Sequence, residues 1–378
     1  MKKFNIGVVG AGRFSKCFIP LFQSHPFTGE VSVADIISER RQKYQTLFGL
    51  KNSYGSFDEM LELADIDAIA IFTQRHLHGE QVVKALRAGK HVYCAVPMAI
   101  DETDIFSIIE EVKRTRLIYM TGETSYYYPD TVLCRDRFRS GLFGDFVYGE
   151  AQYLHDMSHG FYDSFKHSGG ADWKQVAGLP PMFYPTHSVS MILSVTGARA
   201  THVSCFGYRD SHADGIFREG GNLWNNPFSN ESALMRTSDG GMMRLNEFRR
   251  TGGSGVYMGM FGTNASFEEN DIAAVWKTIG GQTENLTEDL KFKDEGIHVD
   301  MSDPSQTVKR DFNSSLAKAH HAYRLPHSYR KMPNGHNGSH QFLVDDFMKA
   351  LRTEKLPPNN AWRRPTTCCP ASPRTGPR

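Results

Sequence analysis

The sequence predicts an α/β protein with two domains. The first is a doubly wound parallel sheet, and the second is an α+β domain with a large open, mostly antiparallel sheet. Three observations predict this: short apolar runs alternate with amphipathic ones in the first third, a glycine-rich turn follows the first run, and the rhythm changes after residue 121. We expect domains at 1–121 and 122–362, and an atypical tail at 363–378.

The strands of the first domain are predicted from buried, β-branched runs. These are FNIGVVG, VSVADI, AIAIF, HVYCAV and LIYMT, and the helical patterns between them are FSKCFIPLFQ, ERRQKYQTLFG, GEQVVKALRAG and ETDIFSIIEEVKRT. Strands that alternate with helices of this length form parallel sheets.

The first turn, Gly10-Ala11-Gly12-Arg13-Phe14-Ser15, lies between the first strand and the first helix. Two glycines there let the backbone approach a pyrophosphate, although Ser15 replaces the third glycine of the usual pattern. Asp35 closes the second strand, where a carboxylate accepts hydrogen bonds from ribose hydroxyls and repels a 2′-phosphate. The turn predicts a Rossmann dinucleotide site and favours NAD, while Arg40 and Arg41 leave NADP open.

The second domain is predicted from longer alternating strands and fewer helices. The strands are FVYGEAQYLHD, THVSCFGY, ESALMRTS, MMRLNEFRR and GVYMGMFGT, and the helices are DTVLCRDRFRSG, THSVSMILSVTG and HQFLVDDFMKALR. Alternation of apolar and polar positions indicates a sheet with one covered face. Residues 280–335 are polar and show no period, so we expect loops or a lid there.

Composition limits the partners. Of the 378 residues, 43 are Lys or Arg and 42 are Asp or Glu, and the net charge of +1 comes without a basic run. Nucleic acid and membrane surfaces are therefore poor partners, and a small molecule is favoured.

No signal pattern or membrane-spanning run is present, and the six cysteines lack zinc or disulfide spacing, so we expect a cytoplasmic protein. The tail at 363–378, RRPTTCCPASPRTGPR, is predicted to be disordered or the product of a frameshift.

The turn, Asp35, the stretch TQRHLHGEQVVKALRAGKHV and a second domain carrying a histidine resemble the glucose-fructose oxidoreductase / inositol dehydrogenase / MocA (Gfo/Idh/MocA) superfamily. Members usually end the GKHV strand with Glu-Lys-Pro, where the lysine assists proton transfer. Here Ala95, Val96 and Pro97 occupy these positions. Because valine cannot exchange a proton, another side chain must act or the chemistry is absent.

The runs GETSYYYPD, FGDFVYGEAQYLHD, YPTH, FGTNASFE and GHNGSH resemble the branch that contains glycoside hydrolase family 109. Those enzymes use NAD and also carry Val-Pro after the GKHV strand. The resemblance implies that Glu123 holds the nicotinamide side, and that the catalytic residues are Tyr153, His155, Tyr184 and His187. The predicted cofactor-binding residues are Gly10, Gly12, Arg13, Phe14, Asp35, Arg40, Thr73, Gln74, His78, Pro97 and Glu123. The family's Trp-Arg looks like Trp173-Lys174 here, which suggests a different sugar.

The chemistry implied by this branch is transient oxidation of a sugar hydroxyl, at C3 by analogy, then elimination, water addition and re-reduction. Tyrosine and histidine suit these proton transfers. A simple NAD(P)-dependent sugar or polyol dehydrogenase and a non-catalytic dinucleotide-binding protein are the alternatives.

Four further residues are candidate substrate contacts: Lys174, Arg249, Arg250 and His336. The two arginines are either exposed charges at a strand edge or contacts to an acidic or sulfonated sugar. His336 and His340 have the spacing of metal ligands on a helix, but glycines interrupt that stretch and no carboxylate or cysteine completes the set, so we expect no metal. The resemblance also implies a homodimer or homotetramer.

Overall fold

The computed structural model describes residues 2–292, 316–332 and 334–362, which fall into two units. The first unit holds residues 2–127 and the described part of 292–362, and the second holds 128–291. This division differs from the predicted one, which placed 122–362 together in the second domain. The predicted tail at 363–378 and residues 293–315 of the predicted loop region lie outside the described residues.

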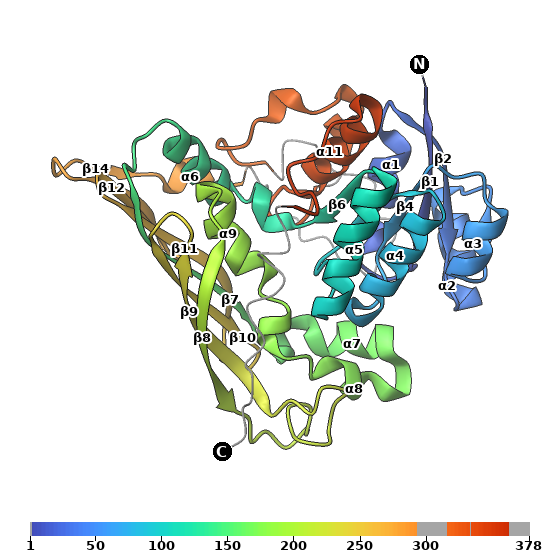
Figure 1. The fold of residues 1–378 in the computed structure, drawn as a ribbon, viewed down its shortest axis with the longest axis horizontal. Coiled ribbons are helices and arrows are strands. Elements are labelled where there is room, and N and C mark those ends of the chain that lie inside the picture. Colours follow the sequence, from blue (N-terminus) through green and yellow to red (C-terminus); the bar gives the residue numbers. More distant parts are fainter. Residues whose placement is uncertain (1, 293–315, 333, 363–378) are drawn as a thin grey trace. The chain divides into compact units, whose positions relative to one another are not determined.

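The first unit contains a six-stranded parallel sheet with the order β3-β2-β1-β4-β5-β6 (Figure 1). Its strands are β1 (Phe4–Val9), β2 (Thr28–Ala34), β3 (Ser53–Tyr54), β4 (Ala68–Ile71), β5 (His91–Ala95) and β6 (Tyr119–Gly122). Its helices are α1 (Ile19–Ser24), α2 (Ser38–Phe48), α3 (Phe57–Leu63), α4 (His78–Arg87), α5 (Glu102–Thr115) and α11 (His340–Thr353). The predicted doubly wound parallel sheet is confirmed, and β3 and α3 were not predicted.

Helix α11 belongs to the first unit because its apolar residues pack there. Phe347 contacts the rings of Phe22 and Tyr93, and His340 lies 4.3 Å from the ring of Phe18, centroid to centroid. All of these side chains are buried. Burial of this apolar face outweighs the distance along the chain between α11 and the other helices of the unit.

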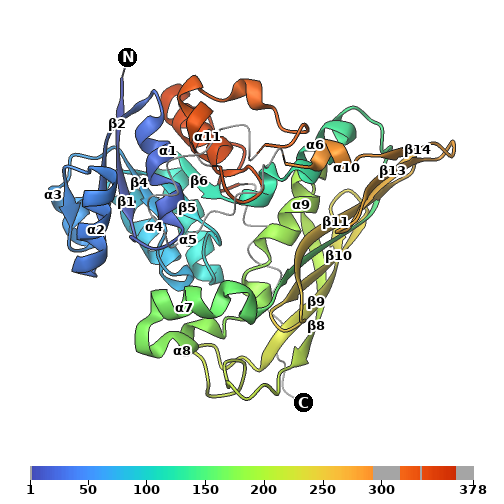
Figure 2. The ribbon, with the colours of Figure 1, turned by 180° about the vertical axis from the view of Figure 1, so that it is seen from behind.

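The second unit contains an eight-stranded sheet with the order β14-β13-β12-β11-β7-β10-β9-β8 (Figure 2). The strands are β7 (Phe146–His155), β8 (Ala200–Arg209), β9 (Phe228–Thr237), β10 (Met242–Phe248), β11 (Ser254–Gly262), β12 (Ala265–Glu269), β13 (Ala274–Thr278) and β14 (Thr283–Asn285). All neighbouring pairs are antiparallel except β7 with β10. The predicted mostly antiparallel sheet is confirmed, and β12–β14 were not predicted.

The helices of the second unit are α6 (Pro129–Arg139), α7 (Tyr162–Gly169), α8 (Trp173–Ala177), α9 (Thr186–Thr196) and α10 (Thr287–Leu290). Helix α9 packs against α6 and across β7, β10 and β11, so it covers one face of the sheet (Figures 1 and 2). We call this covered side the inner face. Nine of the eleven residues of α9 are buried, among them the polar residues Thr186, His187, Ser188 and Ser190.

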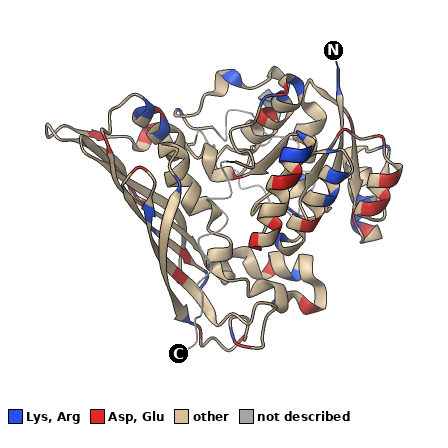
Figure 3. Ribbon diagram, in the orientation of Figure 1, with Lys and Arg blue, Asp and Glu red and all other residues tan. Residues whose placement is uncertain are grey.

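Charges of both signs are interspersed along the helices of the first unit (Figure 3). In the described part of the chain, no helix combines the length and the apolar character that a membrane crossing requires.

Candidate functional site

The glycine-rich turn contains two glycines with different surroundings. Gly10 has a φ of 94°, and a Cβ at this position would lie 2.9 Å from the carbonyl oxygen of Phe72, so only glycine fits. At Gly12, by contrast, no described atom lies within 4 Å of where a Cβ would stand. The backbone at Gly12 therefore borders open space, as the close approach of a pyrophosphate requires.

Ser15 closes the turn in place of the third glycine. Its hydroxyl donates to the carbonyl oxygen of Gly12 at 3.0 Å, and the Tyr44 hydroxyl donates to the same oxygen at 2.6 Å. The segment that follows is a 3₁₀ turn at Ser15–Cys17 and then the short helix α1, rather than one continuous helix.

Asp35 follows β2 and lies against the turn. One carboxylate oxygen accepts a hydrogen bond from the Ala11 N–H at 2.7 Å, and the other accepts one from the Ile37 N–H at 2.7 Å. The Arg41 guanidinium donates to the Asp35 backbone carbonyl at 2.8 Å. The acidic side chain is thus fixed beside the glycine-rich turn, where the predicted ribose contact requires it. Arg40 lies on α2 and is half-buried.

His78 joins the ends of β4 and β5. Its imidazole is buried, with Nδ1 2.7 Å from the carbonyl oxygen of Pro97 and Nε2 3.1 Å from that of Thr73. Burial lowers the pKa of this histidine to about 4, so the ring is neutral near pH 7 and has one N–H to donate. Both nitrogens face backbone carbonyls, and the single N–H of the neutral ring can donate to either, so His78 lies as a brace between the two loops.

The residue that follows β5 is Val96, whose side chain cannot exchange a proton. Val96 is 7% exposed, and the peptide bond between Val96 and Pro97 is cis. Glu123 follows β6 and is buried, with a carboxylate oxygen accepting from the Ser125 N–H at 2.9 Å. The predicted cofactor-binding residues all lie in the first unit, mostly in loops at the carboxyl ends of the parallel strands, where ligands of such sheets bind.

The second unit brings the four predicted catalytic residues into one cluster. Tyr153 and His155 come from β7, His187 from the first turn of α9, and Tyr184 from the segment before that helix. The Tyr184 hydroxyl lies 3.2 Å from Nε2 of His187. The Tyr153 ring lies 4.9 Å from the His187 ring and 6.3 Å from the Tyr184 ring, centroid to centroid. We call Tyr153, Tyr184 and His187 the tyrosine–histidine cluster.

His155 stands at the edge of this cluster. Its ring stacks on Phe161 with centroids 3.7 Å apart and planes inclined by 10°, and it lies 5.6 Å from the Tyr153 ring. The stacking fixes the plane of the imidazole beside Tyr153. Burial holds the pKa of Tyr153 well above the usual value of a tyrosine, although the charge of Arg249 opposes this. Tyr153 is therefore a neutral phenol that can donate a hydrogen bond.

Strand register explains why the cluster forms at one end of the sheet. An apolar row crosses the inner face, and a polar row follows two residues further along the strands. The apolar row is Ala233, Leu245, Ala151 and Met258, and the second row is Glu231, Glu247, Tyr153 and Val256. The same inner face thus changes from apolar core to the candidate site over two residues of each strand.

Glu247 and Glu231 were missed by the sequence analysis. Glu247 is fully buried; its carboxylate accepts from the Ser188 hydroxyl at 2.5 Å and from Nη2 of Arg249 at 3.0 Å. Burial raises the pKa of Glu247 to about 7 against the opposing charge of Arg249, and burial also raises that of Glu231. The signal was present in the sequence, because alternation in MMRLNEFRR puts Glu247 and Arg249 on the face of Met243 and Leu245.

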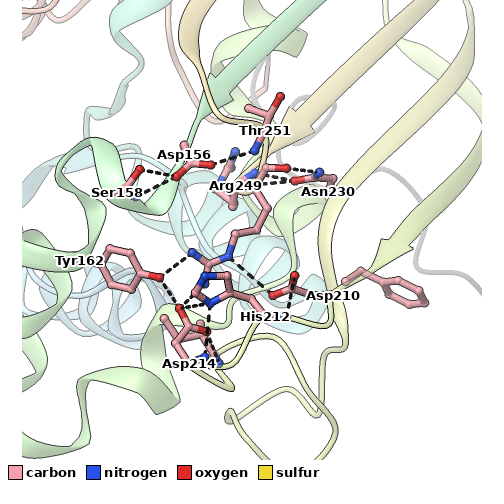
Figure 4. A network of polar contacts seen from close by, with 12 residues as sticks. Asp156, Ser158, Tyr162, Asp210, His212, Asp214, Asn230, Arg249 and Thr251 are labelled. Atoms are coloured by element: carbon pink, nitrogen blue, oxygen red, sulfur yellow. Dashed lines mark hydrogen bonds and ion pairs between the residues drawn. The ribbon is translucent and has the colours of Figure 1, made fainter.

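Arg249 and Arg250 are not charges at a strand edge, because β10 lies between β7 and β9. Arg249 is 5% exposed and pairs with Glu247. Arg250 donates to the Tyr162 hydroxyl at 2.6 Å and pairs with Asp214 (Figure 4). Both cations therefore have carboxylate partners within the unit.

Asp156 fastens the loop after β10 to the end of β7. Its carboxylate accepts hydrogen bonds from the N–H groups of Thr251 and Gly252 and from both the N–H and the hydroxyl of Ser158 (Figure 4). Although burial alone would raise it, these bonds hold the pKa of Asp156 well below its usual range. Lys174, a further predicted substrate contact, donates to the carbonyl oxygen of Asp214 at 2.9 Å.

His336 lies in the first unit, apart from the other predicted substrate residues. Its Nδ1 is 3.0 Å from Nε2 of His340, and its ring lies 5.2 Å from that of Phe14 in the glycine-rich turn. Within the described residues, no group of three or more His, Cys, Asp or Glu side chains has the arrangement of a metal site.

Comparisons with known proteins agree with this architecture. Residues 4–123 match the oxidoreductase family with an NAD-binding Rossmann fold, Gfo/Idh/MocA. An alpha-N-acetylgalactosaminidase of Shewanella oneidensis is 26% identical over 169 residues, covering 42% of this chain and 36% of that protein. A trans-1,2-dihydrobenzene-1,2-diol dehydrogenase of Mus musculus is 26% identical over 190 residues, covering 49% of this chain and 55% of that protein. The chain thus spans less than two thirds of the length of these relatives.

Among solved structures, a levoglucosan dehydrogenase in complex with NADH and levoglucosan superposes with a TM-score of 0.71 at 17% identity, covering 98% of this chain and 95% of that one. At this identity the likeness concerns the fold. The match of residues 4–123 indicates that these residues have the NAD-binding Rossmann fold of that oxidoreductase family.

Proposed function

We propose that this protein is an NAD-dependent enzyme that hydrolyses a neutral glycoside through transient oxidation of a ring hydroxyl. The observation that supports this most directly is the hydrogen-bonded Tyr184–His187 pair beside Tyr153, at the polar end of the inner face. Three proton-transferring or hydrogen-bonding groups meet there, while Val96 leaves the end of β5 without one.

Bound NAD would accept a hydride from the sugar and return it at the end of the cycle. The residues present fit the dinucleotide: the backbone at Gly12 borders open space, and the carboxylate of Asp35 is held beside the turn. A fixed negative charge there favours ribose hydroxyls over a 2′-phosphate, which supports NAD over NADP. Arg41 is turned to the Asp35 carbonyl rather than outward to a phosphate.

His187 and Tyr184 would move the protons of the reacting hydroxyl and of the carbon beside the new ketone. A histidine bonded to a tyrosine can take a proton at its nitrogen while the phenol orients the ring. Tyr153, kept neutral by burial, would donate to the oxygen on which charge develops. His155, with its plane fixed by Phe161, would assist departure of the leaving group or addition of water.

A neutral substrate is favoured over an acidic one. Arg249 and Arg250 are paired with Glu247 and Asp214, and Lys174 donates to a backbone carbonyl. An anionic sugar would have to displace these partners, which costs the interactions already formed.

A simple sugar dehydrogenase is the second candidate, because relatives named as a glycosidase and as a dehydrogenase are equally similar to this chain. Such an enzyme would release the ketone and NADH. The polar groups of the tyrosine–histidine cluster serve both reactions, so the products must separate them.

The test is incubation of the protein with aryl α- and β-glycosides and with free sugars, with and without NAD. Phenol release and NADH absorbance are recorded in parallel. We expect phenol release that depends on NAD without accumulation of NADH. Accumulation of NADH in proportion to the sugar consumed would instead establish the dehydrogenase. The elimination and water addition proposed above would then not take place.

We also propose that the protein forms a homodimer or homotetramer through the outer face of the eight-stranded sheet. Four large apolar side chains on that face are exposed: Phe206, Tyr208, Leu234 and Met242. Register places all four on the side opposite the core. Light scattering of the protein and of a Phe206→Asp variant would test this, and an unchanged mass in the variant would contradict it.

A further inference from the structure

Glu247 is bonded to two different parts of the second unit. Glu247 lies on β10. One of its carboxylate oxygens accepts a hydrogen bond from the hydroxyl of Ser188, in the first turn of α9, and the other accepts one from Arg249, the residue that follows β10. Ser188 is adjacent to His187 in sequence. The carboxylate therefore connects the start of α9 to β10 at the level of the tyrosine–histidine cluster.

Arg249 in turn faces the cluster. The carbon at the centre of its guanidinium lies 5.1 Å from the centroid of the Tyr153 ring and 5.7 Å from that of Phe161, the ring on which His155 stacks. A cation at this distance is attracted to the ring faces. A buried arginine also needs a carboxylate, since an unpaired charge in such a place is strongly unfavourable.

We propose that Glu247 is a positioning residue of this site: it holds Arg249 over Tyr153 and fixes the first turn of α9, and with it His187, against β10. Glu247 acts only through these neighbours. The proposal rests on the proposed function for its kinetic readout.

The charge of Glu247 is set by groups from every element around it. Arg249 lies on the same side of the chain as Glu247, two residues further along. Glu231 lies opposite Glu247 on β9, and Tyr153 lies opposite it on β7. His187 and Ser188 face Glu247 from α9. Burial raises the pKa of Glu247 to about 7, and Arg249 limits the rise. The ion pair with Arg249 is therefore complete only above about pH 7.

The main test is Glu247→Gln, which keeps the side-chain shape and an oxygen that accepts from Ser188 but removes the charge. On whichever aryl glycoside or sugar the unmodified protein turns over, we expect kcat to fall roughly 10- to 100-fold, with the KM for NAD unchanged. The rise of kcat/KM through pH 7 should disappear. The matched control is Glu150→Gln on the outer face of β7, where Glu150 pairs with Arg244 at 2.8 Å; its kcat should stay within about twofold.

A second variant separates loss of activity from loss of folding in Glu247→Gln. Glu247→Gln combined with Arg249→Met removes both charges, so no unpaired cation stays buried. We expect this double variant to be folded but still slow, because no guanidinium lies over Tyr153. Full activity of either variant would overturn the proposal.

An infrared measurement separates this inference from the proposed function. Between pH 6 and 8 the unmodified protein should lose a protonated-carboxyl band, and the Glu247→Gln variant should not. If no glycoside or sugar is turned over, the proposed function fails while this band still tests the state of Glu247. A band that persists to pH 8 and is missing from Glu247→Gln would overturn the inference whatever the activity, because a neutral Glu247 cannot form the ion pair with Arg249. Absence of the band already at pH 6 would mean that the carboxylate is charged throughout this range, which supports the pairing.

Discussion

The glycine-rich turn and the tyrosine–histidine cluster are built from different parts of the chain. At the turn, backbone groups and open space beside Gly12 form the site, and the side chains of Asp35 and Tyr44 hold the backbone in place. In the cluster, side chains form the site, and they come from β7 and from the residues around the start of α9. The turn should therefore be sensitive to added atoms, and the cluster to removed ones.

The largest effect is expected in the cluster. His187→Ala removes the group that we assign to proton transfer, so kcat should fall about 10²- to 10⁴-fold. Tyr184→Phe removes one hydrogen bond to that histidine and should cost about tenfold. Steady-state kinetics on the substrate found in the glycoside screen measures both. His202→Ala, an exposed histidine on β8, is the matched control, and a loss of similar size there would contradict the assignment.

The next effect concerns the pH dependence of stability. The pKa of Glu247 is raised from 4.5 to about 7 in the folded protein, so the folded state binds the proton more tightly than the unfolded one. This contribution to stability is complete below about pH 4.5 and is lost as pH rises through 7, amounting to about 3 kcal/mol. Urea unfolding at pH 5 and pH 8 should show this loss in the unmodified protein and a smaller one in Glu247→Gln. Equal pH dependence in both proteins would show that Glu247 does not titrate in this range.

The glycines allow a sharper contrast within the turn. Gly10→Ala should destabilise the protein by about 1–3 kcal/mol, because its φ is positive and its Cβ would contact the Phe72 carbonyl. Gly12→Ala meets no described atom, so it should leave the unfolding midpoint unchanged yet weaken NAD binding. Thermal unfolding and calorimetric titration with NAD measure the two effects. Similar behaviour of both variants would mean that Gly12 does not face the cofactor.

The smallest effect is expected at His78. His78→Ala removes a brace between the loops after β4 and β5, a loss of about 1 kcal/mol. NAD affinity should fall several-fold, while kcat at saturating NAD should change little. His76→Ala is the neighbouring control. If His78→Ala abolished NAD binding altogether, the imidazole would have to touch the cofactor directly.

Most of the fold was predictable because its signals are local. The strands β1, β2, β4–β6 and β7–β11 and the longer helices follow from periodicity, and α5 spans the same residues as its predicted pattern. Strands β12–β14 were missed because they have only five, five and three residues, too few for a clear periodic signal. The grouping of α11 with the first unit was missed because it depends on contacts between Phe347 and residues more than 250 positions away.

The site was predictable in part for the same reason. The turn and Asp35 lie within one strand–helix–strand unit, whereas the resemblance to a family was needed to propose Tyr153 and His187 together. Glu247 was missed because a charged residue in a strand is usually exposed. Its alternation with Met243 and Leu245 and its register opposite Tyr153 both show that it points inward. For Arg249 the sequence left an edge charge and a substrate contact open, because strand order cannot be read from periodicity.

The central position of β7 has a consequence for how the second unit forms. Strands β8 to β10 follow one another as neighbours, and so do β11 to β14, so each group can pair locally along the chain. β7 precedes both in sequence yet lies between them, bonded to β10 on one side and β11 on the other. Its pairing must close long loops, which is the slow step in sheets of high contact order. The strand that carries Tyr153 is thus the one that joins the two groups of strands into a single sheet, so a change that weakens β7 should affect both the sheet and the cluster.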